Sequence, residues 1–265
     1  MKFESDSRKW RWIALAATVL NIGFNAWSQR TPFGEGTVAQ IAQRYPSLFT
    51  PAGYAFAIWG LIYFTTLIYA VHQLLPSQRK AWAHERLARP VIAVNLLATA
   101  WLVVFQNDLV TLSLVVIAAA CIFSFVLFLR ATAAASRHEV SKWVLLPVSL
   151  WFGWLSVATI ANTSLWLVAM GWTDANQVPW TVGAIGLAVI FGFLVGYRFR
   201  NWIYPLVIAW AAFAIWVERR SDVQVVALAA LGSAALMVAW CGYCVWRARR
   251  ERSGFRIFHG PLDAG

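Results

Sequence analysis

Charged residues are scarce in this chain. They make up 12% of its 265 residues, whereas hydrophobic residues make up 60%. A soluble domain of this size typically contains about 25% charged residues, because its surface has to face water. The deficit of charge excludes an ordinary soluble domain and indicates an integral membrane protein.

Acids and bases are also nearly absent from the middle of the hydrophobic runs. A pump or an ion-coupled transporter normally needs such a group at mid-depth in the bilayer. His72 lies near the end of one run, and as an isolated histidine we interpret it as structural. This absence disfavours the pump class.

Cysteine is rare, and enzyme motifs are missing. Cys241 and Cys244 form a CxxC pair, but no histidine or acid nearby completes a metal site. The serines of the hydrophobic runs have no histidine or acid in the same layer, so no catalytic triad can form. We expect no metal and no required cofactor, and we predict that the protein is not an enzyme.

Hydrophobic runs are the dominant feature of the sequence. Each is close to the ~20 residues that a helix needs to cross a bilayer. They predict an all-α, polytopic membrane helix bundle of about eight transmembrane helices, in a single membrane domain over residues 1–265. The runs cover residues 11–28, 52–75, 90–106, 109–130, 143–170, 181–198, 202–217 and 223–246.

The basic residues predict an orientation. With the N-terminus inside, 18 of the 22 lysines and arginines fall in inside segments, including a basic cytoplasmic tail at 247–265. Lysine and arginine accumulate on the cytoplasmic side of membrane proteins, so we predict that both termini are cytoplasmic. The net charge of +11 then follows from basic loops that stay on the cytoplasmic side of the membrane. Nucleic acid is therefore not an expected partner.

The run at 143–170 carries polar groups at regular spacing. Trp154, Ala158, Asn162 and Trp166 recur every four residues and therefore share one helix face. An asparagine at mid-depth does not suit a lipid-facing surface, so we expect this face to point inward. Tryptophan rings and an amide between helices suit a flat apolar ligand. Ordinary helix packing is the alternative for each tryptophan taken alone.

Three motifs resemble one family. The segment TPAGYAFAIWGLIY contains Tyr54, Trp59 and Tyr63, a later run contains Trp101 and Phe105, and WLSVATIAN is followed by a tryptophan. Over residues 10–172 these motifs resemble the TspO/MBR family, the tryptophan-rich sensory proteins related to the mitochondrial translocator (peripheral benzodiazepine receptor) protein. The chain departs from the family at Ala98, where the family has asparagine.

The resemblance implies a five-helix part with a ligand pocket, roofed by the long loop from Ser28 to Thr50, and three additional helices at 181–246. It also implies a homodimer and a tetrapyrrole ligand such as porphyrin or haem. The predicted ligand-binding residues are Tyr54, Trp59, Tyr63, Trp101, Phe105, Trp154, Ala158, Asn162 and Trp166.

The function predicted from these features is that of a binding or sensory protein in the bacterial inner (plasma) membrane, with the lipid bilayer and a hydrophobic small molecule as partners. One alternative is a transporter of a small apolar or zwitterionic solute, although no repeat relates the two halves of the chain. The other alternative is an accessory protein that binds another membrane protein.

Overall fold

The computed structural model describes residues 3–31 and 33–257 of the chain and consists mainly of helices, with no strand in these residues. The all-α prediction is therefore confirmed for this part. The α-helices are α1 (Phe3–Arg30), α2 (Val38–Arg44), α3 (Ile58–His72), α4 (Ala83–Gln106), α5 (Val110–Ser136), α6 (Leu145–Ala169), α7 (Asp174–Phe199), α8 (Ile203–Arg219) and α9 (Gln224–Ile257). Short 3₁₀ turns are η1 (Gly53–Ala57), η2 (Pro76–Gln78) and η3 (Lys142–Val144).

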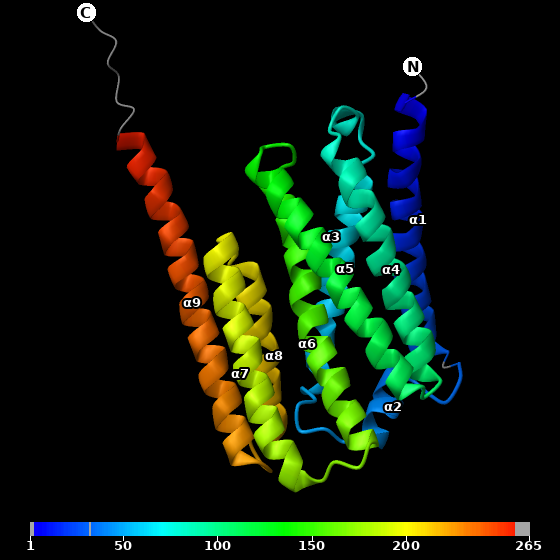
Figure 1. The fold of residues 1–265 in the computed structure, drawn as a ribbon, viewed down its shortest axis with the longest axis vertical. Helices are drawn as coiled ribbons and strands as arrows, with labels where there is room; N and C mark the ends of the chain where they lie inside the picture. The colour runs from blue at the N-terminus through cyan, green and yellow to red at the C-terminus, as the bar shows by residue number, and fades with distance from the viewer. Residues whose placement is uncertain (1–2, 32, 258–265) are drawn as a thin grey trace, which may run out of the picture.

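The long helices lie side by side and alternate in direction, from α1 at one side of the molecule to α9 at the other (Figure 1). The start of α1 and the end of α9 lie at the same end, together with the α3–α4, α5–α6 and α7–α8 connections. We call this the basic end, because the arginine-rich segments meet there, and we call the other the α2 end. The predicted alternation of basic segments is thus reproduced by the fold.

Six helical segments of the described residues are long and apolar enough to cross a membrane, which supports a multi-pass membrane protein. They are Gly53–His72, Ala83–Gln106, Val110–Ser136, Lys142–Ala169, Ala175–Phe199 and Gln224–Ala248. Helix α8 has only 17 residues, and α1 is not among the six. The count of eight spans remains a prediction.

Helix α4 begins at Ala83, earlier than the predicted start at residue 90, and continues through Pro90. Proline has no N–H, so it leaves the carbonyl of the residue four positions earlier without its helical donor. That residue is Arg86, and its carbonyl accepts a hydrogen bond from Arg130 Nη1 of α5 at 3.2 Å. A neighbouring helix thus satisfies the freed carbonyl, and the helix is not broken.

A buried arginine fixes α1 against the α3–α4 connection at the basic end. Arg11 is 2% exposed and pairs with Glu85. Its guanidinium also donates to the backbone carbonyls of Gln73, Gln78 and Ala81 at 3.0, 2.8 and 3.0 Å. Hydrogen bonds from a guanidinium to this many acceptors offset the cost of placing the group away from water.

Amide side chains join α1 to α4 deeper in the bundle. Asn21 Nδ2 donates to Asn95 Oδ1 at 3.1 Å, and Asn95 Nδ2 donates to Thr18 Oγ1 at 3.2 Å. Thr99 Oγ1 donates to Asn21 Oδ1 at 3.3 Å. Hydrogen bonds between helices are the usual use of such residues inside a bilayer.

Helices α7 and α9 approach each other through glycines. A Cβ on Gly192 would lie 2.5 Å from Met237 Sδ, and a Cβ on Gly196 would lie 2.5 Å from Trp240 Nε1. The GxxxG spacing on α7 therefore places helix surfaces in direct contact.

Candidate ligand-binding site

A crevice lies among α1, α3, α4, α5 and α6, each of which contributes to its wall. Its walls lie close together and leave about 10 Å³ between them, no more than one water molecule needs, so the side chains nearly fill it. The crevice is lined by Asn25, Trp59, Tyr63, Ala98, Trp101, Leu102, Ile117, Ala120 and Leu155.

Stacked aromatic rings form two sides of the crevice. On α3, Trp59 and Tyr63 stack at 5.3 Å between ring centroids. On α4, Trp101 stacks on Phe105 at 4.9 Å. Trp154 of α6 contacts the edge of Trp59 at 6.4 Å and at an interplanar angle of 88°. The rings thereby support one another and present apolar faces to the crevice.

Two tryptophans of this group carry buried indole N–H groups without an acceptor. Trp101 Nε1 and Trp154 Nε1 have no hydrogen-bond partner among the described residues. A buried donor without an acceptor costs about 1–3 kcal/mol. A ligand that offers an acceptor at this place would recover that energy.

Three of the predicted ligand-binding residues line the crevice, namely Trp59, Tyr63 and Trp101. Trp154 is 2% exposed and lies against Trp59, as the inward-facing stripe of α6 predicts. Ala158, one turn further along that stripe, packs against the same apolar core.

Two other predicted residues lie toward the α2 end. Phe105 is buried in a second apolar cluster, and Trp166 packs against that cluster. Ile41 of α2 belongs to the same cluster, so α2 covers the ends of the helices that carry both aromatic residues. This arrangement matches the roof that the resemblance implies for the loop from Ser28 to Thr50.

The amide of Asn162 is engaged by a neighbouring helix. Asn162 Oδ1 accepts a hydrogen bond from Ser113 Oγ of α5 at 3.0 Å. One turn away, Trp166 Nε1 donates to Thr111 Oγ1 at 3.1 Å. In this structure these polar groups join α5 to α6.

Tyr54 lies apart from the other predicted residues. It is 42% exposed in η1, and its ring contacts the edge of Trp210 of α8 at 5.4 Å. Trp210 Nε1 donates to the carbonyl of Ala55 at 3.0 Å. The structure therefore places Tyr54 at the junction of η1 and α8.

The α2 segment is held by local capping and by charge. Thr37 and Gln40 form a reciprocal capping box at the start of α2. Arg44, at its end, pairs with Asp108 at 2.8 Å. Burial, followed by the hydrogen bond with Asp108, raises the pKa of the adjacent Tyr45 hydroxyl. The hydroxyl therefore remains protonated at neutral pH.

Asn25 and Ala98 line the crevice but were not among the predicted ligand-binding residues. A signal existed for Asn25, which follows Asn21 by one turn and shares its face. Ala98 takes the position at which the TspO/MBR motif has asparagine, so Asn25 supplies an amide to the crevice from the facing helix α1.

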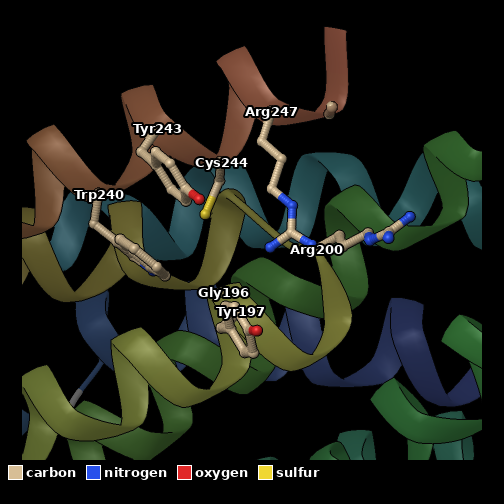
Figure 2. A pocket seen from close by; sticks show the side chains of 8 residues that line it. Gly196, Tyr197, Arg200, Trp240, Tyr243, Cys244 and Arg247 are labelled. Atoms are coloured by element: carbon tan, nitrogen blue, oxygen red, sulfur yellow. The ribbon is translucent and has the colours of Figure 1, made fainter. Parts of the chain in front are cut away.

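A second crevice lies between α7 and α9 at the basic end (Figure 2). Arg247 lies over the ring of Tyr197 at 5.4 Å, and Trp240 stacks on Tyr243 at 5.1 Å. Cys244 lines this crevice. No group of three metal-binding side chains occurs among the residues that the structure describes.

A helical membrane bundle with an aromatic crevice among five of its helices defines the class of membrane binding or sensory proteins. A family model for TSPO-like proteins matches residues 11–243 of the chain. The chain therefore belongs to the TSPO-like, or TspO/MBR, family. The match extends beyond the motifs, which end at residue 172, and runs through α7 and α8 into α9. No curated protein and no solved structure matches the chain.

Proposed function

We propose that the protein binds a flat hydrophobic ligand, a tetrapyrrole such as porphyrin or haem, in the crevice among α1, α3, α4, α5 and α6. The observation that carries the proposal is the pair of buried indole N–H groups of Trp101 and Trp154, which lack acceptors among the described residues. Trp101 lines a crevice walled by stacked rings, and Trp154 lies behind this wall against the edge of Trp59. A carboxylate-bearing aromatic ligand supplies both an acceptor and a stacking surface.

The size of the crevice bears on how such a ligand enters. The side chains nearly fill the crevice and leave about 10 Å³, the space of one water molecule, so a tetrapyrrole requires its walls to separate. The proposed movement is a displacement of α2 from the cluster around Ile41 and Phe105, which would free the α2 end of the helices that form the walls.

Quenching of tryptophan fluorescence during titration with protoporphyrin IX tests the proposal. Trp101→Phe retains a smaller aromatic ring and removes the indole N–H. We expect affinity to fall at least about tenfold, because a hydrogen bond to a charged acceptor contributes about 1.5–3 kcal/mol. Trp154→Ala removes a supporting ring and should also weaken binding. Trp12→Phe, at a 60% exposed position on α1, is the control. Unchanged affinity in both crevice variants would overturn the proposed site.

We further propose that all eight long helices cross the bacterial inner membrane, with the basic end in the cytoplasm. The alternation of basic segments supports this orientation, and the hydrophobic lengths of six helices support the membrane location. Single cysteines at Arg79 and Arg219, in a background without the native cysteines, should react with impermeant maleimide from opposite sides of inverted vesicles. Labelling of both from one side would contradict the orientation.

A further inference from the structure

The basic end contains a hollow that is separate from the aromatic crevice. It lies between the first turns of α4 and the last turns of α5 and has an empty volume of about 330 Å³, including the space open to the surface. Arg86, Arg130 and Arg137 line it, and Ala83 and Leu87 provide an apolar floor. Both floor residues are buried.

The hollow has an excess of positive charge. Glu139 is the acid of its wall and pairs with both Arg86 and Arg137, the latter at 3.7 Å. Arg130 donates one hydrogen bond, to the carbonyl that Pro90 leaves free. The wall therefore carries three guanidinium groups and one carboxylate, so two positive charges remain uncompensated within it.

These arginines are held in position. Glu139 N–H donates to the carbonyl of Ala134 at 2.9 Å, which fixes the connection after α5 against the last turns of α5. The Arg86–Glu139 pair then joins the two helices, and the bond from Arg130 to the Arg86 carbonyl joins them again. A preorganised set of guanidinium groups suits a phosphate, because each presents a planar fork of donors.

An apolar surface continues from the hollow toward the other end of the bundle. Val126 and Phe123 lie one and two turns from Arg130 on the same face of α5. Val126 is half-buried and Phe123 is 43% exposed. A molecule with an anionic head and a long apolar chain matches this succession of surfaces.

We propose that the hollow binds the phosphate group of an anionic phospholipid, whose acyl chain lies along the Val126 and Phe123 face of α5. The phosphate binds to Arg130 and Arg137, and Arg86 remains paired with Glu139. The lipid is a structural ligand at the junction of α4 and α5, and its binding is independent of the tetrapyrrole crevice.

Lipid retention by the purified full-length protein tests the proposal. Native mass spectrometry in detergent would compare binding of dioleoyl phosphatidylglycerol and dioleoyl phosphatidylcholine. We expect preference for the glycerol lipid. The variant Arg130→Gln/Arg137→Gln should bind it about 30-fold more weakly, because each basic residue near a lipid surface contributes about a fivefold factor.

A matched control removes the same charge at the same end. Arg79→Gln/Lys80→Gln changes two exposed basic residues of the α3–α4 connection that do not line the hollow. A site predicts that this control binds phosphatidylglycerol within about twofold of wild type. Diffuse attraction depends on total charge, so equal losses in both double variants would overturn the proposal, as would equal binding of the two lipids by wild type.

Two further measurements complete the test. Inorganic phosphate at 10 mM should not displace the lipid, since it lacks the acyl chain. Full displacement would show a site for free anions and overturn the assignment to lipid.

The variant Arg130→Lys/Arg137→Lys retains the positive charge and should therefore retain most of the affinity, even if the glutamine variant is misfolded. The contrary result is a folded lysine variant that binds phosphatidylglycerol as weakly as the glutamine variant does, with no preference over phosphatidylcholine. That result would show that the charge has no effect and would contradict the proposal.

Discussion

The helices before and after residue 172 are joined in different ways. In α1–α6, side-chain hydrogen bonds run between helices, as from Asn21 to Asn95 and from Ser113 to Asn162. Between α7 and α9, close approach at Gly192 and Gly196 takes their place. The first region thus uses directional polar contacts, and the second uses small residues.

The difference explains where the crevice lies. Hydrogen bonds fix two helices at defined points and leave the space between those points to large side chains. Glycine contacts bring helix surfaces together and exclude such space. The aromatic crevice lies among α1–α6, and the hollow between α7 and α9 in Figure 2 begins at Gly196 and lies toward the basic end.

The largest effect is expected from breaking the charge cluster of the first region, which is the ion pair of Arg11 with Glu85. Arg11→Ala removes a buried guanidinium and leaves the half-buried Glu85 without its partner, and breaking a buried pair typically costs about 3–5 kcal/mol. The free energy of unfolding in mixed micelles measures this loss. The control Arg79→Ala lies at an exposed position and should change stability by less than about 0.5 kcal/mol. Equal effects would show that the buried pair has no special role.

A methyl group at the glycine contact tests the second region. Gly196→Ala places a Cβ 2.5 Å from the rigid indole of Trp240, and overpacking of this kind costs about 1–3 kcal/mol. Gly183→Ala on the same helix meets nothing within 4 Å and should be neutral or slightly stabilising. The same unfolding assay distinguishes them. Equal stability of the two variants would argue against close packing of α7 on α9.

A smaller effect is expected where the two regions meet. Asn201 Nδ2 donates to Ser149 Oγ of α6 at 2.6 Å, and its Oδ1 accepts from the N–H groups of Ile203 and Tyr204 at 3.0 Å each. Asn201→Ala removes these bonds at the start of α8 and should cost about 1–2 kcal/mol. Asn201→Asp retains the acceptor for the two N–H groups and should recover part of the loss.

The smallest effect is expected from removing two hydrogen bonds between helices of the first region. Asn95→Ala removes the contacts to Asn21 and Thr18, and interhelical hydrogen bonds in membranes contribute about 0.6 kcal/mol each on average. Thr163→Ala removes a hydroxyl that bonds only within α6 and serves as the control. A loss above about 3 kcal/mol would show that the amide network, rather than the charge cluster, dominates this region.

Sequence patterns predicted the helices well because hydrophobic length is a local property. The predicted run at 143–170 corresponds to η3 and α6. Helix α4 begins earlier than the predicted residue 90, because Arg130 of α5 donates to the carbonyl that Pro90 leaves free. Spacing along α6 also predicted the burial of Trp154 and Asn162. It could not predict that Ser113 would donate a hydrogen bond to the amide oxygen of Asn162, since that bond depends on the rotation of α5 against α6.

The amino-acid sequence alone determined that this chain forms apolar helices, which of their ends carry positive charge, and which face of α6 turns inward, because hydropathy and the 3.6-residue period act within each helix. Tertiary structure decided which side chains meet. It separated Tyr54 from Trp59, brought Asn25 beside Trp101 and gathered three arginines around one carboxylate. These arrangements depend on contacts between segments that are distant in the sequence, and each is fixed only when the helices pack together.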